Sequence, residues 1–352
     1  MNLSTIPVPP GAPTLDRARG ALLGLAVGDA LGAPAENLTP EEIKARWGRV
    51  EGFVLDEPAG TDDTEYTIFS ALLLIEHGHQ LTPAQVEDAW RSRIANGAEG
   101  PFRGAGFSER STVENLRRGL TAPQSAQHRH AWSDGLVMRA APFGVFAAGD
   151  PLEAARLIAV DGSVSHEGEG IYGGMAVAAA VAVAVAGADL DTAVDAAFAV
   201  VPEDSWTART LARALAAVRE ERHASDATTP QGREAVERAI RRAAVVRGYP
   251  WTDLAPEAVG LAFGALAAAD GDFRTAVLTA VNMGRDADTT AAVAGAVAGA
   301  LSGADAIPAA WRSAIGPAGG SCLAWVRGRH VLEVADALRQ AAEPAAQIGG
   351  TR

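Results

Sequence analysis

Hydrophobic residues recur at spacings of three and four through most of the chain, which is the period of helices that bury one face. Strand-like alternation of β-branched residues is scarce, and only Val50–Asp56 suggests a short strand. The pattern predicts an all-α fold. Helices are expected over Leu15–Leu31, Glu65–His77, Pro83–Ala95, Ser111–Arg118, Leu152–Ala159, Gly173–Ala188, Leu190–Val200, Trp206–His223, Gln231–Arg247, Pro256–Ala269, Phe273–Asn282, Ala291–Ser302, Ala309–Ala314 and Val331–Gln340.

Two of these expected helices carry glycine at every fourth position. Glycine costs up to about 1 kcal/mol at each helical site relative to alanine, so a repeated glycine needs a compensating reason. A stripe of glycines leaves a smooth face that another backbone can approach closely. We therefore predict that the two helices pack against each other through these positions. The glycines are Gly20, Gly24, Gly28 and Gly32 in the first helix, and Gly295, Gly299 and Gly303 in the second.

Composition narrows the class of protein. The chain has 352 residues, with 30 Lys and Arg against 43 Asp and Glu, and this net charge of −13 excludes a surface that coats duplex nucleic acid. A single cysteine, Cys322, excludes an internal disulfide framework. The longest apolar stretch, from Met175, is shorter than the ~20 residues of a membrane span, so no membrane partner is expected.

The ends of the chain differ from its middle. A Pro-rich leader, 1–14, has neither the basic nor the apolar segment of a secretory signal, which predicts a cytoplasmic protein. A tail follows at 343–352. No linker or charge run divides residues 15–342, and these are predicted to form one domain.

Two acidic clusters stand apart from the Ala-rich background. Thr61-Asp62-Asp63-Thr64 and Asp286-Ala287-Asp288-Thr289 each come directly before an expected helix. Asp and Thr are preferred helix caps, so capping explains either cluster alone. Capping needs only one residue, however, and four carboxylates brought together would repel unless a cation neutralised them. Hard oxygen donors of this kind suit Mg²⁺, Mn²⁺ or Ca²⁺ better than zinc, and four carboxylates with hydroxyls are enough for two such ions.

Five segments in fixed order resemble the ADP-ribosylglycohydrolase family, which includes dinitrogenase-reductase-activating glycohydrolase. The resemblance covers roughly residues 15 to 340. It implies an all-α orthogonal helical bundle with a dinuclear Mg²⁺ or Mn²⁺ site, and hydrolysis of the bond between C1″ of ADP-ribose and an acceptor. The substrate would be an ADP-ribosylated protein or small molecule. The segments are RARGALLGLAVGDALGAPAE (17–36), GTDDT (60–64), SDGLVMRAAPFG (133–144), SVSHEGEGIYGG (163–174) and GRDADTTAAVAGAVAGA (284–300).

The resemblance also assigns roles to residues. Glu36 matches a loop glutamate that lies over the metals, although a lone glutamate after a turn is ordinarily surface charge. Glu36 or a metal-bound carboxylate would take the proton from water, which makes Glu36, Asp62 and Asp286 the expected catalytic residues. The expected metal ligands are Thr61, Asp62, Asp63, Asp286, Asp288 and Thr289.

A second group of residues is expected to bind substrate. Glycine-rich loops let backbone N–H groups approach phosphate or ribose oxygens. His166 would lie beside the substrate, although a histidine at such a junction is more often a structural hydrogen bonder. The predicted group is Ser133, Asp134, Gly135, His166, Gly168, Gly170, Tyr172 and Arg285.

Two departures from the family pattern concern the leaving group. Many members read Gly-Asn-Gly where this chain has Ser133-Asp134-Gly135, and an aspartate beside a pyrophosphate adds repulsion. Many also have Gly-Gly where this chain has Gly284-Arg285. Arg285 has three possible roles: pairing with an aspartate, contacting a phosphate, or narrowing the pocket. Arg139 has two, a phosphate contact or an internal salt bridge.

Several other residues keep alternative interpretations. Asp29 is a candidate buried partner of a neighbouring loop, and Glu109 is a candidate acid near the acceptor. Trp132 and Phe107 either stack on an adenine or pack in the core or at the rim. The basic stretch within 231–247 reads as a solvated helix face.

Three functions compete at this point. The first is a metal-dependent hydrolase that releases ADP-ribose from an acceptor. The second is a hydrolase of another N- or O-riboside in the same scaffold. The third is a non-catalytic binder of ADP-ribose or metal, as the crystallin relatives of the family suggest, although the intact acidic clusters and Glu36 count against it.

Overall fold

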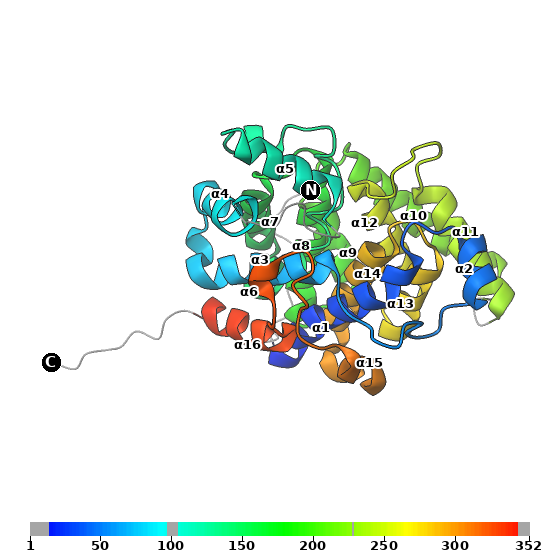
Figure 1. The fold of residues 1–352 in the computed structure, drawn as a ribbon. Coiled ribbons are helices and arrows are strands. Elements are labelled where there is room, and N and C mark those ends of the chain that lie inside the picture. Colours follow the sequence, from blue (N-terminus) through cyan, green and yellow to red (C-terminus); the bar gives the residue numbers. More distant parts are fainter. Residues whose placement is uncertain (1–13, 97–104, 227–228, 344–352) are drawn as a thin grey trace.

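The computed structural model describes residues 14–96, 105–226 and 229–343, and within them the chain forms α-helices joined by loops and short 3₁₀ turns (Figure 1). The predicted leader and tail lie outside these residues, apart from Thr14 and Glu343. The α-helices are α1 (Leu15–Gly32), α2 (Pro40–Trp47), α3 (Asp62–His77), α4 (Pro83–Trp90), α5 (Phe107–Arg117), α6 (Ala141–Phe146), α7 (Pro151–Gly162), α8 (Glu169–Val185), α9 (Leu190–Ala199), α10 (Trp206–Ala224), α11 (Pro230–Ala244), α12 (Ala255–Ala268), α13 (Phe273–Asn282), α14 (Ala287–Ser302), α15 (Ala309–Ala314) and α16 (Val331–Ala342).

The predicted all-α class is confirmed, and every expected helix is present with small shifts at its ends. The predicted strand at Val50–Asp56 is wrong, because this segment is irregular. Its first residue has the side chain of Asn282 as its partner instead of a second strand: Val50 N–H donates to Asn282 Oδ1 at 3.0 Å, and Asn282 Nδ2 donates to Val50 O at 2.9 Å. Helix α2 was missed because it is short and polar, although Thr39 and Glu42 form a capping box at its start.

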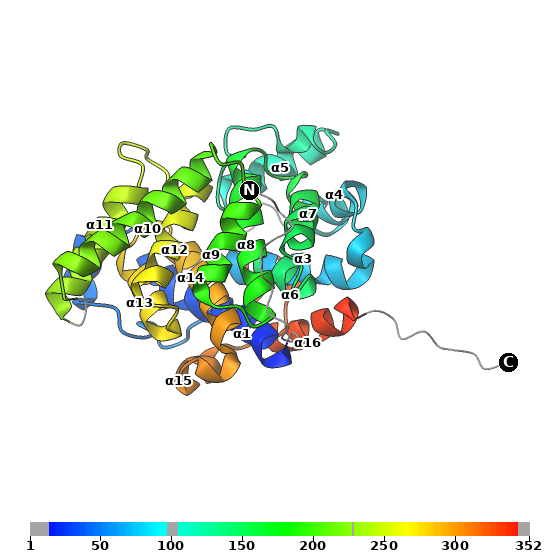
Figure 2. The same cartoon turned by 180° about the vertical axis from the view of Figure 1, so that it is seen from behind.

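The predicted contact between the two glycine-rich helices is present. Gly20, Gly24 and Gly28 of α1 meet backbone atoms of α14 so closely that a Cβ on any of them would lie within 3.0 Å of Gly299, Gly295 or Ala291 in turn. Rising numbers on α1 meet falling numbers on α14, so the two helices are antiparallel. Both lie in the middle of the molecule, and α16 packs beside α1 (Figures 1 and 2).

The remaining helices surround this central pair. Helices α10, α11 and α12 form one end of the molecule with α2 beside α11, whereas α4, α5 and α7 form the other end (Figures 1 and 2). Helix α8 is apolar on most of its faces and is buried against α6, α7, α9 and α14. Within the described residues, no helix is both long and apolar enough to cross a membrane.

Helix α3 is fixed to the C-terminal part of the chain by a buried carboxylate. Glu65 is completely buried, and it accepts hydrogen bonds from the backbone N–H groups of Ser321, Cys322 and Leu323 at 2.6–2.9 Å. A buried charge needs such partners, since an unpaired one is expensive to desolvate. This attachment holds the start of α3, and therefore the first acidic cluster, in place.

The close contact between the glycines of α1 and α14 predicts that adding one methyl group there lowers the stability of the protein. In Gly24→Ala the new Cβ would clash with backbone of Gly295, which cannot move aside as a flexible side chain would. We expect the free energy of unfolding to fall by about 2 kcal/mol or more, as for other overpacked cores, in a chemical denaturation experiment. Gly316→Ala is the control, because a Cβ there meets open space. Equal stabilities of the two variants would contradict the close helix contact.

Candidate functional site

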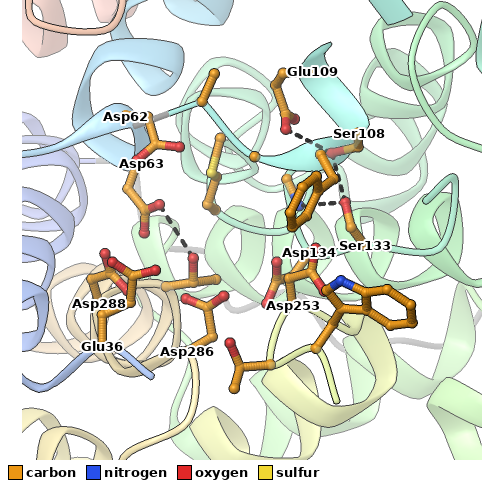
Figure 3. Close-up of a pocket in the computed structure, with 18 of the residues that line it drawn as sticks. Glu36, Asp62, Asp63, Ser108, Glu109, Ser133, Asp134, Asp253, Asp286 and Asp288 are labelled. Atoms are coloured by element: carbon orange, nitrogen blue, oxygen red, sulfur yellow. Dashed lines mark hydrogen bonds between the residues drawn. The ribbon is translucent and has the colours of Figure 1, made fainter. Parts of the chain in front are cut away.

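The acidic clusters meet in one cavity of about 420 Å³. It lies among the first turns of α3, α5 and α14, the loop after α1, and the loops 133–138 and 250–253. Figure 3 shows carboxylates from these separate segments pointing into a shared space. The acidic residues that line it are Glu36, Asp62, Asp63, Glu109, Asp134, Asp253, Asp286 and Asp288.

The first cluster is held by an aspartate of α1. Asp29 is completely buried, and its carboxylate accepts hydrogen bonds from the backbone N–H and the hydroxyl of both Thr61 and Thr64. The predicted alternative for Asp29, a buried partner of a neighbouring loop, describes this arrangement. The Thr61 side chain does not cap α3, and Asp29 satisfies the first-turn N–H of Thr64 instead. Asp62 and Asp63 are therefore not needed as caps.

A hydrogen bond joins the two clusters across the cavity. The Thr289 hydroxyl in the first turn of α14 donates to Asp63 Oδ1 at 3.2 Å. Thr61, Asp62, Asp286, Asp288 and Thr289 all line the same cavity as Asp63, so the fold brings together all six residues that were expected to bind metal.

Burial and mutual repulsion raise the pKa values of these acids. Burial is the first cause for Asp62, Asp63 and Asp288, and neighbouring carboxylates add to it: Glu109 acts on Asp62, and Asp286 acts on Asp288. Each of these three pKa values lies well above the usual range of an aspartate. The cluster is thus strained when it is fully ionised, which is the condition that a bound cation relieves.

The donor chemistry of the cavity fits a divalent cation. Asp63 Oδ2 and Asp288 Oδ1 are buried oxygens without a hydrogen-bond partner, on opposite acidic clusters. Thr61 and Thr289 line the same cavity, and carboxylate and hydroxyl oxygens are ligands that Mg²⁺ and Mn²⁺ accept. No three acidic, histidine or cysteine side chains of the described ranges already converge in a metal-binding arrangement.

Glu36 is at the rim of the cavity, on the loop after α1. Its Oε1 accepts a hydrogen bond from Asn37 Nδ2 at 2.8 Å. Desolvation by the surrounding chain, together with the charge of Asp286, raises the pKa of Glu36 to about 7. A carboxylate with this pKa is suited to take up or release a proton near neutral pH.

Comparison with known proteins agrees with this architecture. The model of the ADP-ribosylglycohydrolase family matches residues 10–347. The chain belongs to the ADP-ribosylglycohydrolase family. An uncharacterized protein of Archaeoglobus fulgidus is 30% identical over 291 residues, which cover 80% of this chain and 86% of that protein. A solved structure described as an ADP-ribosylglycohydrolase-related protein complex is similar with a TM-score of 0.60 and 25% identity, covering 94% of this chain and 99% of the other.

The residues that were expected to bind substrate fall into two groups. Ser133, Asp134 and Gly135 line the cavity. His166 does not: it is buried behind Ser133, with Nε2 at 3.1 Å from the Ser133 hydroxyl and Nδ1 at 2.8 Å from the Ser165 hydroxyl. The histidine is thus a structural hydrogen bonder in this fold, which is the alternative that its position had left open.

The glycine-rich loop of 163–174 also serves packing. Gly168 has φ +49° and leaves room for the Trp132 indole, and a Cβ on Gly170 would lie within 3.0 Å of the Ala131 carbonyl oxygen. Tyr172 is partly buried against the hydrophobic core. Among the described residues that line the cavity, none comes from this loop. The expectation that Gly168, Gly170 and Tyr172 bind substrate gains no support from this geometry.

The two arginines considered for phosphate binding, Arg285 and Arg139, form ion pairs within the protein. Arg285, at φ +67°, pairs with Glu257 at 2.5 Å and donates to Trp251 O at 2.9 Å, outside the cavity lining. These contacts use Nε and Nη2, and the expectation that Arg285 binds substrate gains no support from this geometry. Arg139 is completely buried and pairs with Asp161 at 3.1 Å, so the internal salt bridge is the correct interpretation for it.

Sequence reasoning missed Asp253 as a site residue. It lines the cavity beside Asp134, whose backbone N–H donates to Asp253 O at 3.0 Å. Burial, with the charge of Asp286 second, raises the pKa of Asp253 to about 6. In the sequence Pro-Trp-Thr-Asp this residue reads as an ordinary helix start before α12. Only the long-range contact with the loop at 133–135 places it in the site.

The two aromatic candidates, Phe107 and Trp132, differ in their position relative to the cavity. Phe107 lines the cavity, is half exposed, and stacks on His130 with ring centroids 5.0 Å apart. Trp132 lies outside the cavity lining and packs edge-on against Trp206. Packing against a neighbouring side chain, the second of the predicted alternatives, therefore describes Trp132.

The raised pKa of Asp253 predicts how stability depends on pH in the presence of EDTA. The folded protein keeps the Asp253 proton up to about pH 6, whereas the unfolded chain loses it near pH 4, so this group stabilises the fold at low pH and that contribution disappears as pH rises through 6. We expect Asp253→Asn to become more stable relative to the wild type between pH 4 and pH 8, by about 2 kcal/mol. Denaturant unfolding across that range measures the difference. A constant difference would show that Asp253 titrates normally.

Proposed function

We propose that the protein is a divalent-cation-dependent glycosidase that cleaves the C1″ glycosidic bond of ADP-ribose attached to a protein or a small-molecule acceptor. One observation carries the proposal. Two acidic clusters from the starts of α3 and α14 share a buried cavity in which Asp63 Oδ2 and Asp288 Oδ1 have no hydrogen-bond partner. Family membership supports a glycohydrolase, and the donor set supports its dependence on a cation.

Residues at different positions in the cavity would have different roles in this reaction. Thr61, Asp62, Asp63, Asp286, Asp288 and Thr289 would hold two Mg²⁺ or Mn²⁺ ions. When bound, such ions orient substrate hydroxyls and lower the pKa of a coordinated water. Glu36, with its pKa of about 7, would accept the proton of the attacking water at the rim. The other carboxylates would stabilise positive charge as C1″ gains oxocarbenium character.

A second candidate substrate is a riboside without a pyrophosphate. Eight carboxylates line the cavity, and Arg110 is the one cationic side chain among the described lining residues. Asp134, which replaces the asparagine of many members, is itself buried in this wall. Ionised carboxylates of this wall that the proposed cations leave unneutralised would repel a pyrophosphate, whereas they would not repel a neutral or cationic group. Turnover of a panel containing ADP-ribosyl-arginine, an ADP-ribosyl-serine peptide and pyrophosphate-free N-ribosides separates the two candidates.

The metal assignment predicts severe and specific losses. We expect Asp62→Ala or Asp286→Ala to reduce turnover by about 10³-fold or more, because each removes a ligand from the group that holds the cation. Circular dichroism should show the helical fold intact. Asp191→Ala, an exposed residue in the first turn of α9, is the control and should keep its turnover. Near wild-type turnover of either site variant would overturn the assignment.

The proposed ligand can be tested without turnover. Calorimetric titration of ADP-ribose is expected to show binding in the presence of Mg²⁺ and none after EDTA treatment, because the cation neutralises the carboxylates. Tight Mg²⁺ binding without ADP-ribose binding would favour the pyrophosphate-free riboside. Absence of Mg²⁺ and Mn²⁺ binding would contradict the proposal as a whole.

A further inference from the structure

A continuous chain of buried hydrogen bonds runs from a fully buried arginine to the wall of the cavity. Its successive links measure 2.7, 2.8, 3.1, 2.7 and 2.6 Å. Each member is less than 5% exposed, and Figure 3 shows Ser133, Ser108 and Glu109 together on one side of the cavity. The members are, in order, Arg139, Ser165, His166, Ser133, Ser108 and Glu109.

The chemistry of its end fixes the direction of every link. A carboxylate only accepts, so the Ser108 hydroxyl must donate to Glu109 Oε2. Ser108 then accepts from the Ser133 hydroxyl, which has its single proton committed to that bond. Ser133 in turn must accept from His166, so Nε2 of the imidazole carries the proton.

The other end of the chain agrees with this direction. Burial and the charge of Arg139 lower the pKa of His166 well below its usual value, so the imidazole is neutral and its Nδ1 is an acceptor. The Ser165 hydroxyl donates to Nδ1, and its oxygen accepts from Arg139 Nη2, a group that only donates. Each hydroxyl therefore donates to one neighbour in the chain and accepts from the other, and Ser133 also accepts from the Gly135 N–H at 3.4 Å.

The geometry around Glu109 leaves its carboxylate one position. A Cβ on Gly106 or Gly135 would lie within 3.0 Å of a Glu109 carboxylate oxygen, so the group fits between two glycines. Arg139 Nη1 is 3.9 Å from Oε1 and supplies opposite charge without a hydrogen bond. Glu109 lines the cavity, and Oε1 has no hydrogen-bond partner. Glu109 Oε1 is thus an oriented hydrogen-bond acceptor at the cavity wall that has no partner within the protein.

We infer that this chain fixes Glu109 so that Oε1 accepts a hydrogen bond from an N–H or O–H group of the substrate, and that Ser108, Ser133 and His166 are positioning residues which act through Glu109. The inference rests on the proposed function for the identity of the substrate, but the hydrogen-bond chain stands independently of it. In this role, His166 and Ser133 support Glu109 and need not contact the ligand themselves.

The direction of the chain is tested by nitrogen-15 NMR of the metal-free protein. Long-range proton–nitrogen correlations distinguish the two neutral tautomers of a histidine, and the signal of His166 is assigned by its loss in His166→Gln. The expected spectrum at pH 7 is that of a neutral imidazole protonated at Nε2. An imidazole protonated only at Nδ1 would overturn the inference, since Ser133 would then have to donate to two partners or lose one. A charged imidazole would overturn it as well, since Nδ1 could then no longer accept from the Ser165 hydroxyl.

The action through Glu109 is tested by a double-mutant cycle with the panel conjugate that the wild type hydrolyses fastest. Ser108→Ala removes the last link, and we expect kcat/KM to fall about tenfold, as for loss of a hydrogen bond to a charged group. In the Glu109→Gln background, the same change should alter kcat/KM by less than about twofold. Full, additive losses in the two backgrounds would overturn the positioning role.

A matched variant separates positioning from stability. Ser125 is also completely buried, and its hydroxyl donates to Val164 O at 2.7 Å outside the chain. Ser125→Ala should lower the unfolding midpoint about as much as Ser108→Ala while leaving kcat/KM within about twofold of the wild type. An equal loss of kcat/KM in both variants would contradict the inference. If the wild type hydrolyses no panel member, the proposed function and the substrate contact of Glu109 are both contradicted. The direction of the hydrogen-bond chain is then tested by the NMR experiment alone.

Discussion

The close backbone contact between α1 and α14 is the constraint on which the rest of the site depends. Because Gly20, Gly24 and Gly28 have no side chains, the two antiparallel helices touch along their length. The last glycine of the stripe, Gly32, meets Ala287 and Asp288 at the start of α14. The end of α1 is thereby placed against one acidic cluster. A bulkier stripe would separate the helices and open the cavity.

The same helix reaches the other acidic cluster through one residue. Asp29 is in the last turns of α1, and it receives four hydrogen bonds from Thr61 and Thr64. Helix α1 therefore connects both clusters: through a packing contact with α14 and through a buried carboxylate with α3. The repulsion among the acids, which raises their pKa values, opposes this assembly. Rigid packing opposes this repulsion, and the proposed cation would neutralise it when bound.

Much of this architecture could be predicted because its signals are local. The glycine spacing predicted the contact of two helices far apart in sequence, and the two Asp-rich helix starts predicted one shared site. Other features depend on long-range contacts that have no local signature. In the sequence, Asp253 has the pattern of a helix start, and only the folded structure shows Asp134 beside it. Val50 has the pattern of a strand residue, but in the structure the side chain of Asn282 takes the place of a strand partner.

Diffraction from crystals soaked in Mn²⁺, recorded near the manganese absorption edge, tests the central claim most directly. The claim is that α1 and α14 bring the two acidic clusters together around divalent cations. The account predicts anomalous peaks in the cavity, within about 2.5 Å of carboxylate oxygens from both clusters, Asp63 and Asp288 among them. A cavity without a peak, or a peak bound by one cluster alone, would contradict it.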